Sequence, residues 1–201
     1  MKYGFILPSG DARTAANLAR EAELSGWDGF FLMEACWHID AWVSLAAAAM
    51  CTDTIRLGTM LSPLSRMRPW KLASETATLD NLSNGRVILS VGTGALWMGY
   101  QPFLDEVRDT QVRAELLDEG IDVLNLLYEG KPARYDGKHY HVDLSALDPQ
   151  YYPPPPVQKP RIPIWVVGVW PRMKSMRRVL KCDGLLPNKI NPDGQFGQYT
   201  P

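Results

Sequence analysis

The chain has 201 residues, of which 46% are hydrophobic and 21% are charged, and its formal net charge is −1. This length suffices for one sizeable core in one or two domains, and the near-even charge balance excludes the basic footprint of a nucleic-acid or anionic-membrane binder. The opening MKYGFILPSG has no signal-peptide pattern, and the longest apolar segment, LAAAAMC from Leu45, is too short to cross a bilayer.

Apolar runs of strand length alternate with helical patterns in the first half of the chain. Asp40 is placed to cap a helix, Pro69 suits the first turn of another, and Gly26 and Gly85 suit helix ends. The predicted strands are residues 2–7, 27–33, 55–61 and 86–92, and the predicted helices are residues 14–26, 41–51 and 70–83.

The second half begins with a long amphipathic helix over residues 110–128. Residues 130–161 interrupt the alternation with KHYHVDL, which predicts one strand of a hairpin, and YYPPPP, which predicts an extended surface connection. We therefore expect one domain over residues 1–201 with a hairpin and proline-rich insertion at 130–161. Further strands are predicted at residues 162–168 and 183–187, with a helix at 173–181 between them.

Two clusters of polar residues in this half have simple interpretations. His139, His141 and Asp143 alternate along one strand, but no fourth ligand is evident, so no metal site is predicted. The basic residues around Arg177 and Arg178 indicate a solvated helix face.

Repeated βα units with strands that are apolar on both faces indicate a parallel sheet covered by helices. The sequence predicts about six such units. Two architectures fit them, an open doubly wound sheet or most of a (β/α) barrel.

The stretch VILSVGTGALWMG, residues 87–99, places a glycine turn directly after a predicted strand. A dinucleotide fingerprint needs a third small residue where Trp97 stands, and no Lys-Ser or Lys-Thr follows to make a P-loop. The two glycines are compatible with a plain turn and also with a close approach of the backbone to a ligand.

Polar and aromatic side chains gather where the predicted strands end. Ligands bind at the C-terminal ends of parallel strands in barrels and in open sheets alike, so these side chains predict a pocket for a flat aromatic ligand. They are Glu34, Trp37, His38, Thr59, Trp97 and Trp170.

Two long runs, together with KYGFILP and WDGFFLME, resemble the luciferase-like flavin-dependent oxidoreductase family. The runs are IRLGTMLSPLSRMRPWKLASETATLDNLSNGRVILSVGTG and PPPPVQKPRIPIWVVGVWP followed by MRRVLKCDGLLP. The resemblance implies an α/β fold of the (β/α)8 TIM-barrel type, here incomplete, which binds FMN or the deazaflavin coenzyme F(420). It also implies a non-prolyl cis peptide near residues 59–61.

The resemblance places the cofactor at the C-terminal mouth of the barrel. Glu34 is followed by Ala35 where many members have histidine, so His38, four residues after the glutamate, is a hypothetical acid or base beside Glu34. The residues predicted to contact the cofactor are Thr59, Met60, Gly92, Thr93, Gly94, Trp97, Gly168, Trp170 and Arg172.

The function predicted by this resemblance is that of a flavin-dependent oxidoreductase, in particular a monooxygenase acting on a small organic substrate. The resemblance also implies a homodimer. The alternatives are a non-catalytic flavin-binding or partner-dependent relative and an open-sheet nucleotide-binding domain. Three dispersed cysteines suit reduced thiols, so we expect a cytoplasmic location.

Overall fold

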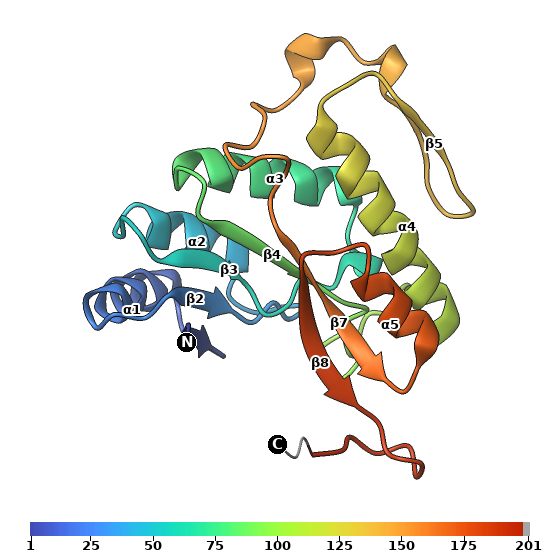
Figure 1. Ribbon diagram of the computed structural model, residues 1–201, viewed down its shortest axis with the longest axis horizontal. Coiled ribbons are helices and arrows are strands. Elements are labelled where there is room, and N and C mark those ends of the chain that lie inside the picture. Colours follow the sequence, from blue (N-terminus) through green and yellow to red (C-terminus); the bar gives the residue numbers. More distant parts are fainter. Residues whose placement is uncertain (199–201) are drawn as a thin grey trace.

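Six parallel strands form one sheet in the computed structural model, which describes residues 1–198 (Figure 1). Their spatial order is their order along the chain, β1-β2-β3-β4-β7-β8, and every neighbouring pair is parallel. The strands are β1 (Gly4–Leu7), β2 (Gly29–Leu32), β3 (Arg56–Thr59), β4 (Val87–Val91), β7 (Ile164–Trp170) and β8 (Gly184–Lys189).

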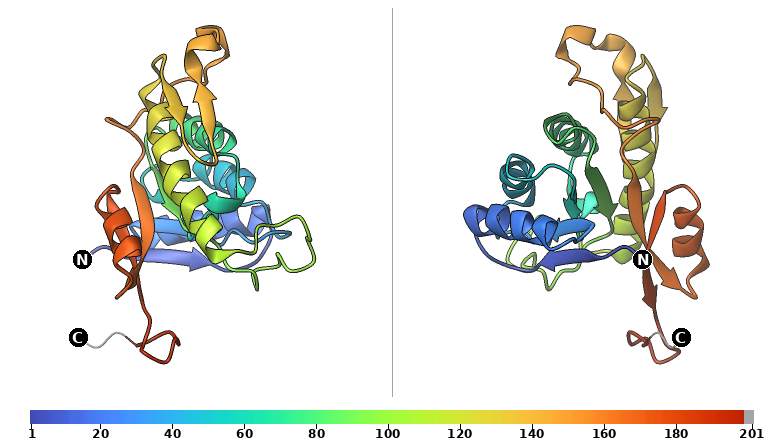
Figure 2. Two further views of the ribbon diagram at one scale, coloured as in Figure 1. Left: turned by 90° about the vertical axis from the view of Figure 1, so that its right-hand side faces the viewer. Right: turned by 60° about the vertical axis from the view of Figure 1, so that its left-hand side comes forward.

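Five α-helices connect these strands and lie in an arc around the outer side of the curled sheet (Figure 2). They are α1 (Ala12–Leu24), α2 (Ala41–Ala49), α3 (Pro69–Leu82), α4 (Thr110–Glu129) and α5 (Met173–Val179). A doubly wound sheet carries helices on both faces, so the structure selects the barrel-type alternative and overturns the open-sheet one.

The helix termini follow the predicted capping chemistry, with one exception. The Asp40 carboxylate accepts a hydrogen bond from the Val43 N–H at 2.8 Å, and Gly26 takes the left-handed conformation after α1 with a φ of +81°. The prediction for Gly85 was displaced by one residue. Asn84, with a φ of +53°, occupies the first position after the cap of α3, and Gly85 follows it.

The outer face of the sheet and the helices enclose the hydrophobic core. Fully buried leucines from the strands meet small alanines from α1 and α2, which lets the helices approach closely. Members of this core include Phe30, Leu32, Leu57, Leu89, Ile164, Ala15, Ala19, Leu45 and Ala48.

The concave inner face is filled by larger rings. Phe31 and Trp165 lie with ring centroids 5.8 Å apart, and both rings face residues that lack side chains. A Cβ at Gly58 would lie 2.2 Å from the Ile88 carbonyl oxygen and 3.1 Å from the Phe31 ring, so glycine is required there for β3 and β4 to pair.

The chain between α4 and β7 forms a separate two-stranded antiparallel sheet of β5 (Arg134–Asp136) and β6 (His141–Asp143), seen beside α4 in Figure 1. His139 precedes β6 and bonds Glu115 of α4 at 2.9 Å, so the expected sharing of one strand face with His141 is wrong. The Glu119 carboxylate accepts the N–H groups of residues 138–140 at 2.9–3.0 Å, which attaches the hairpin to α4.

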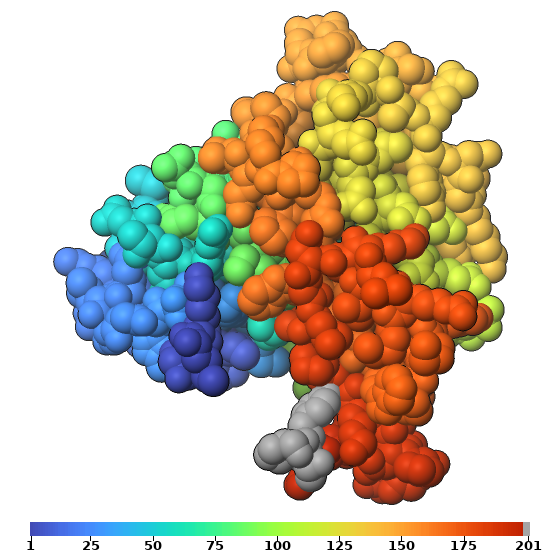
Figure 3. Space-filling model, in the orientation of Figure 1, coloured from blue at the N-terminus to red at the C-terminus, as the bar shows by residue number. Residues whose placement is uncertain are grey.

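The helix face around Arg178 also differs from its prediction. Arg178 is 7% exposed, and its guanidinium pairs with the Asp118 carboxylate of α4, with 3.0 Å between Nη2 and Oδ2. The two edge strands, β1 and β8, do not pair with each other within residues 1–198, and the blue and red segments that contain them lie on one face of Figure 3. No helix in this part of the chain has the length and apolar content that a bilayer crossing needs.

Glu23 stabilises the fold through hydrogen bonds that its carboxylate accepts from the chain before β3. Its partly buried carboxylate accepts the N–H groups of Asp53, Thr54 and Ile55 at 3.0, 2.6 and 2.7 Å, tying the end of α1 to the start of β3. Burial raises the pKa of Glu23, but these N–H donors outweigh it and lower the pKa to about 2.

Because the folded pKa lies below the unfolded one, the stabilisation is present above about pH 4.5 and is lost as pH falls through about 2. We expect Glu23→Gln to lower the free energy of unfolding by about 1–3 kcal/mol at pH 7 and by less as pH approaches 2. Urea denaturation at several pH values measures this. The exposed Glu21→Gln is the control, and an equal loss in both variants would contradict the assignment.

Candidate functional site

Polar residues from three successive βα connections meet at the C-terminal ends of β2, β3 and β4. Glu34 follows β2, Ser62 follows β3 and Gly92 follows β4. Because the strands are parallel and adjacent, these connections emerge at one rim of the sheet. Hydrogen bonds join all three, and of the side chains expected to gather here only Glu34 and Thr59 take part in this network among residues 1–198.

The backbone between β3 and β4 forms the floor of the site. The Met60 N–H donates to the Leu32 carbonyl at 2.7 Å, and the Met60–Leu61 peptide is cis, as the resemblance implied. The Ser62 N–H donates to the Ser90 carbonyl at 2.8 Å, while the Ser62 carbonyl accepts the Gly92 N–H at 3.1 Å. Met60 is thereby fixed beside β2, and Gly92 is fixed beside Ser62.

Glu34 is the ionisable group at the centre of this rim. The Ser62 hydroxyl donates to the Glu34 carboxylate, and the Thr59 and Ser62 hydroxyl oxygens lie 2.8 Å apart. Burial raises the pKa of Glu34 to about 7, the negative charges of Glu75 and Asp40 act in the same direction, and the Ser62 hydrogen bond opposes them. A carboxyl group with such a pKa holds or releases a proton near neutral pH, which suits acid–base chemistry.

The glycine turn after β4 brings backbone rather than side chains to the rim. Gly94 has a φ of +66°, and a Cβ there would lie 2.7 Å from the Pro63 Cβ. The Thr93 carbonyl accepts the Ser65 hydroxyl at 2.9 Å. Ser90 is fully buried, and its hydroxyl has no hydrogen-bond partner within residues 1–198. Close packing against Pro63 accounts for the glycine at position 94, and the unsatisfied Ser90 hydroxyl is the feature that fits a polar ligand group better than a closed core.

Two buried arginines hold the segment that follows this turn. Arg66, whose side chain is 2% exposed, forms an ion pair with Glu106, and its guanidinium carbon lies 4.2 Å from the centre of the Tyr100 ring. The Arg113 guanidinium of α4 donates to the Gly94 carbonyl at 3.0 Å. The chain from Gly94 to Glu106 is therefore anchored at both ends beside the rim.

The remaining predicted residues are not joined to this hydrogen-bonded cluster. His38 is exposed in the turn before α2, Trp97 and Trp170 are 72% and 55% exposed, and Arg172 is an exposed residue directly before α5. A Cβ at Gly168 would lie 2.4 Å from Leu185, so packing of β7 against its neighbours accounts for this glycine.

The sequence analysis missed four residues that the structure places at this site. Ser62, Ser90 and Glu75 surround Glu34 or the glycine turn, and Arg66 anchors the following segment. Ser62 lies only three residues after Thr59, which was identified. The signal available in the sequence was the polar character of Ser62 and Ser90 at the ends of otherwise apolar strands.

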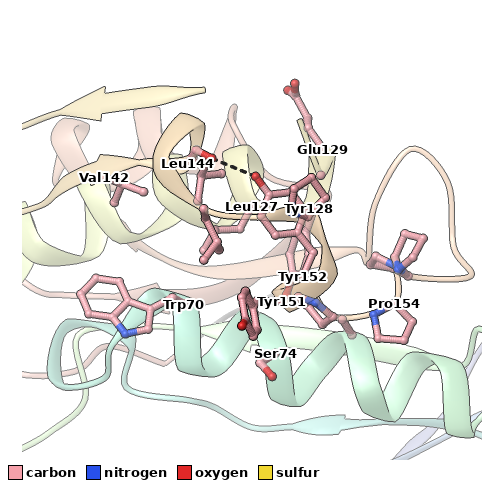
Figure 4. A pocket seen from close by; sticks show the side chains of 18 of the residues that line it. Trp70, Ser74, Leu127, Tyr128, Glu129, Val142, Leu144, Tyr151, Tyr152 and Pro154 are labelled. Carbon is pink, nitrogen blue, oxygen red and sulfur yellow. Dashed lines mark hydrogen bonds between the residues drawn. The ribbon is translucent and has the colours of Figure 1, made fainter. Parts of the chain in front are cut away.

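A large cavity lies elsewhere, between α3, the end of α4 and residues 141–156 (Figure 4). Its volume is about 1000 Å³, and Trp70, Tyr151, Tyr152 and Leu144 are among its walls. None of the residues predicted to bind the cofactor lines it. The rim, and not this cavity, is therefore the candidate active site.

A curled parallel sheet with an acid–base group at the C-terminal rim defines a (β/α)-barrel type of protein. The family described as luciferase-like monooxygenase matches residues 3–201, and the chain belongs to this family. An uncharacterized protein of Mycobacterium tuberculosis is 34% identical over 196 residues, which cover 83% of this chain and 64% of that protein.

Solved structures agree with the fold. The coenzyme F(420)-dependent tetrahydromethanopterin reductase of Methanopyrus kandleri is 25% identical, with a TM-score of 0.76 over 96% of this chain and 57% of that one. The oxygenating constituent of 3,6-diketocamphane monooxygenase from Pseudomonas putida, in complex with FMN, has a TM-score of 0.68 at 22% identity, over 84% of this chain and 52% of that one. The chain thus spans between about half and two thirds of the length of these three relatives.

Proposed function

We propose that this protein is a flavin-dependent oxidoreductase that binds FMN or the deazaflavin F(420) at the C-terminal rim of its sheet and acts on a small organic substrate. The observation that carries the proposal is the hydrogen-bonded cluster of Glu34, Ser62 and Gly92, where an acid–base group adjoins bare backbone. Membership of the luciferase-like monooxygenase family supports it.

The cofactor would lie against Thr59, Met60 and the Gly92–Gly94 backbone, on the strength of the family resemblance and of their place at the C-terminal ends of β3 and β4. Trp97, Gly168, Trp170 and Arg172 complete the proposed contacts around the rim, on the strength of the family resemblance. The cofactor would supply the redox chemistry by accepting or donating a hydride equivalent.

The chain's own contribution would be positioning and proton transfer. Glu34 would hold a proton on its carboxyl near neutral pH and exchange it with the substrate. His38 is proposed as a second acid or base at the exposed edge of the rim. The finer proposal is a monooxygenase, in which the rim residues exclude water from the reacting atoms.

Fluorescence titration of the protein with FMN and, separately, with F(420) tests cofactor binding. We expect saturable binding of one of them in the micromolar range. Gly94→Ala should weaken that binding at least tenfold, because the new Cβ would meet Pro63 beside the ring.

Gly130→Ala is the matched control, since Gly130 has nearly the same left-handed φ of +63° but lies at the end of α4 with nothing within 4 Å of a new Cβ. Failure of both cofactors to bind would overturn the proposal. Binding without turnover would instead favour a non-catalytic flavin-binding protein.

A homodimer in the cytoplasm is the remaining part of the proposal. The family resemblance supports a dimer, and the dispersed cysteines Cys36, Cys51 and Cys182 support a reducing compartment. Sedimentation equilibrium tests the first, and a mass corresponding to one chain would contradict it.

A further inference from the structure

Three oxygen-bearing side chains lie in a row behind the rim. The Glu34 carboxylate contacts the Ser62 hydroxyl, and the Ser62 hydroxyl lies 2.8 Å from the Thr59 hydroxyl. The Thr59 hydroxyl in turn lies 3.4 Å from the Ser90 carbonyl oxygen. Glu34 is half-buried, whereas Thr59 and Ser62 are fully buried, so these two hydroxyl groups, the hydroxyl chain, have no bulk water to satisfy them.

The hydrogen bonds along the hydroxyl chain can be donated in either of two directions. With Glu34 ionised, the Ser62 hydroxyl donates to the carboxylate and accepts from the Thr59 hydroxyl. With Glu34 neutral, its O–H donates to Ser62, the Ser62 hydroxyl donates to Thr59, and the Thr59 hydroxyl donates to the Ser90 carbonyl. Each hydroxyl keeps its own proton, and only the directions of donation reverse.

We propose that Ser62 is the positioning residue of Glu34, and that the hydroxyl chain reverses direction each time Glu34 gains or loses a proton. The inference rests on the proposed acid–base role of Glu34. It explains how a buried carboxyl can cycle between its two forms without leaving an unsatisfied polar group or moving the backbone.

The other charged groups around Glu34 do not offer a comparable partner. Asp40, which caps α2, and Glu75, on α3, are carboxylates that repel the ionised form. Tyr100, on the segment after β4, is buried with its ring against Arg66. The buried Trp42 indole N–H also favours the ionised form of Glu34, but it can only donate, so Ser62 is the partner that can both donate to the carboxylate and accept from the neutral carboxyl.

Two substitutions should shift the proton affinity of Glu34 in opposite directions. Ser62→Ala removes the donor to the ionised form, so we expect proton affinity to rise about tenfold. Thr59→Val removes the acceptor for the Ser62 hydroxyl when Glu34 is neutral and the donor to that hydroxyl when Glu34 is ionised. A buried O–H without an acceptor costs more than a lone pair without a donor, so we expect the proton affinity of Glu34 to fall about threefold. Loss of structure alone would not produce opposite signs.

The measurement is a pH titration of the carboxyl bands by infrared difference spectroscopy on the protein without cofactor, with Glu34→Gln assigning the bands. Thr59→Ser keeps the hydroxyl and should titrate as the wild type does. Ser65→Ala is the matched control, because this buried hydroxyl donates to the Thr93 carbonyl and not to Glu34. Circular dichroism confirms that each variant is folded.

Opposite shifts in Ser62→Ala and Thr59→Val support the inference, and any other pair of results overturns it. The cofactor titration is a separate readout. Flavin binding without opposite shifts would overturn the inference alone, whereas opposite shifts without flavin binding would overturn the proposed function alone.

Discussion

Glu34→Gln is expected to lower the turnover of a flavin-dependent reaction by about 10²- to 10⁴-fold, which is the usual contribution of a positioned acid or base. Glutamine has nearly the same shape and can still accept from Ser62, but it cannot exchange a proton. Steady-state kinetics with reduced cofactor measure the loss. Flavin affinity should change little, so the effect should fall on kcat more than on KM.

The same substitution has a distinct signature in stability. The folded pKa of Glu34, about 7, lies above its ordinary value of 4.5, so the folded state retains a proton that the unfolded state has lost. Stability of the wild type therefore declines between about pH 4.5 and 7. Glu34→Gln should be more stable than the wild type at pH 8 and should lose this advantage below pH 4.5. The exposed Glu129→Gln is the control, and a pH-independent difference would contradict the assignment.

Arg86→Met is expected to produce the largest loss of stability, about 3–5 kcal/mol in the free energy of unfolding. Arg86 is 8% exposed, and burial lowers its pKa. Its guanidinium donates to the carbonyls of Ser83, Ala49, Thr52 and Ile55 at 2.7, 3.0, 2.8 and 3.1 Å, and to the Thr52 hydroxyl at 2.8 Å. Methionine fills part of the volume but leaves these oxygens without donors.

Thermal and urea denaturation measure the effect of Arg86→Met. The exposed Arg20→Met on α1 is the control and should change the free energy of unfolding by less than about 0.5 kcal/mol. Equal losses in the two variants would show that the guanidinium of Arg86 does not join α2, α3 and β4 as its hydrogen bonds indicate.

The order of strands and helices was predictable because the apolar pattern changes period at each boundary. Asp40 as a capping residue and Gly26 as a helix end predicted their boundaries to within a few residues, whereas Asp11, which caps α1, was not identified. The shift at Gly85 arises because asparagine also tolerates the left-handed conformation, so Asn84 could end the helix one residue earlier.

The candidate site was predictable only in part, because strand ends can be read from a sequence but hydrogen-bond partners cannot. Glu34 and Thr59 were identified from their positions at the ends of strands, whereas Ser62 was missed because its partner Glu34 lies 28 residues away in the sequence. Arg178 was misjudged for the same reason. Its partner Asp118 is 60 residues away on another helix, and no local pattern reveals such a pair.

The connection from α4 to β7 is held at three separate points. Glu119 fixes the hairpin to α4, and the Pro155 carbonyl accepts a hydrogen bond from the Asn81 side-chain amide of α3 at 3.0 Å. Gln158 returns the chain to the sheet by donating to the buried Asp80 carboxylate at 2.8 and 3.0 Å and to the Val87 carbonyl at 2.8 Å. Residues 145–151 lie between the first two points and, in the part of the chain that the structure describes, hydrogen-bond only to residues 143–152. We therefore expect insertions or deletions there to leave the strand register unchanged, so a reporter peptide or affinity tag can be placed in this stretch without disturbing the rim.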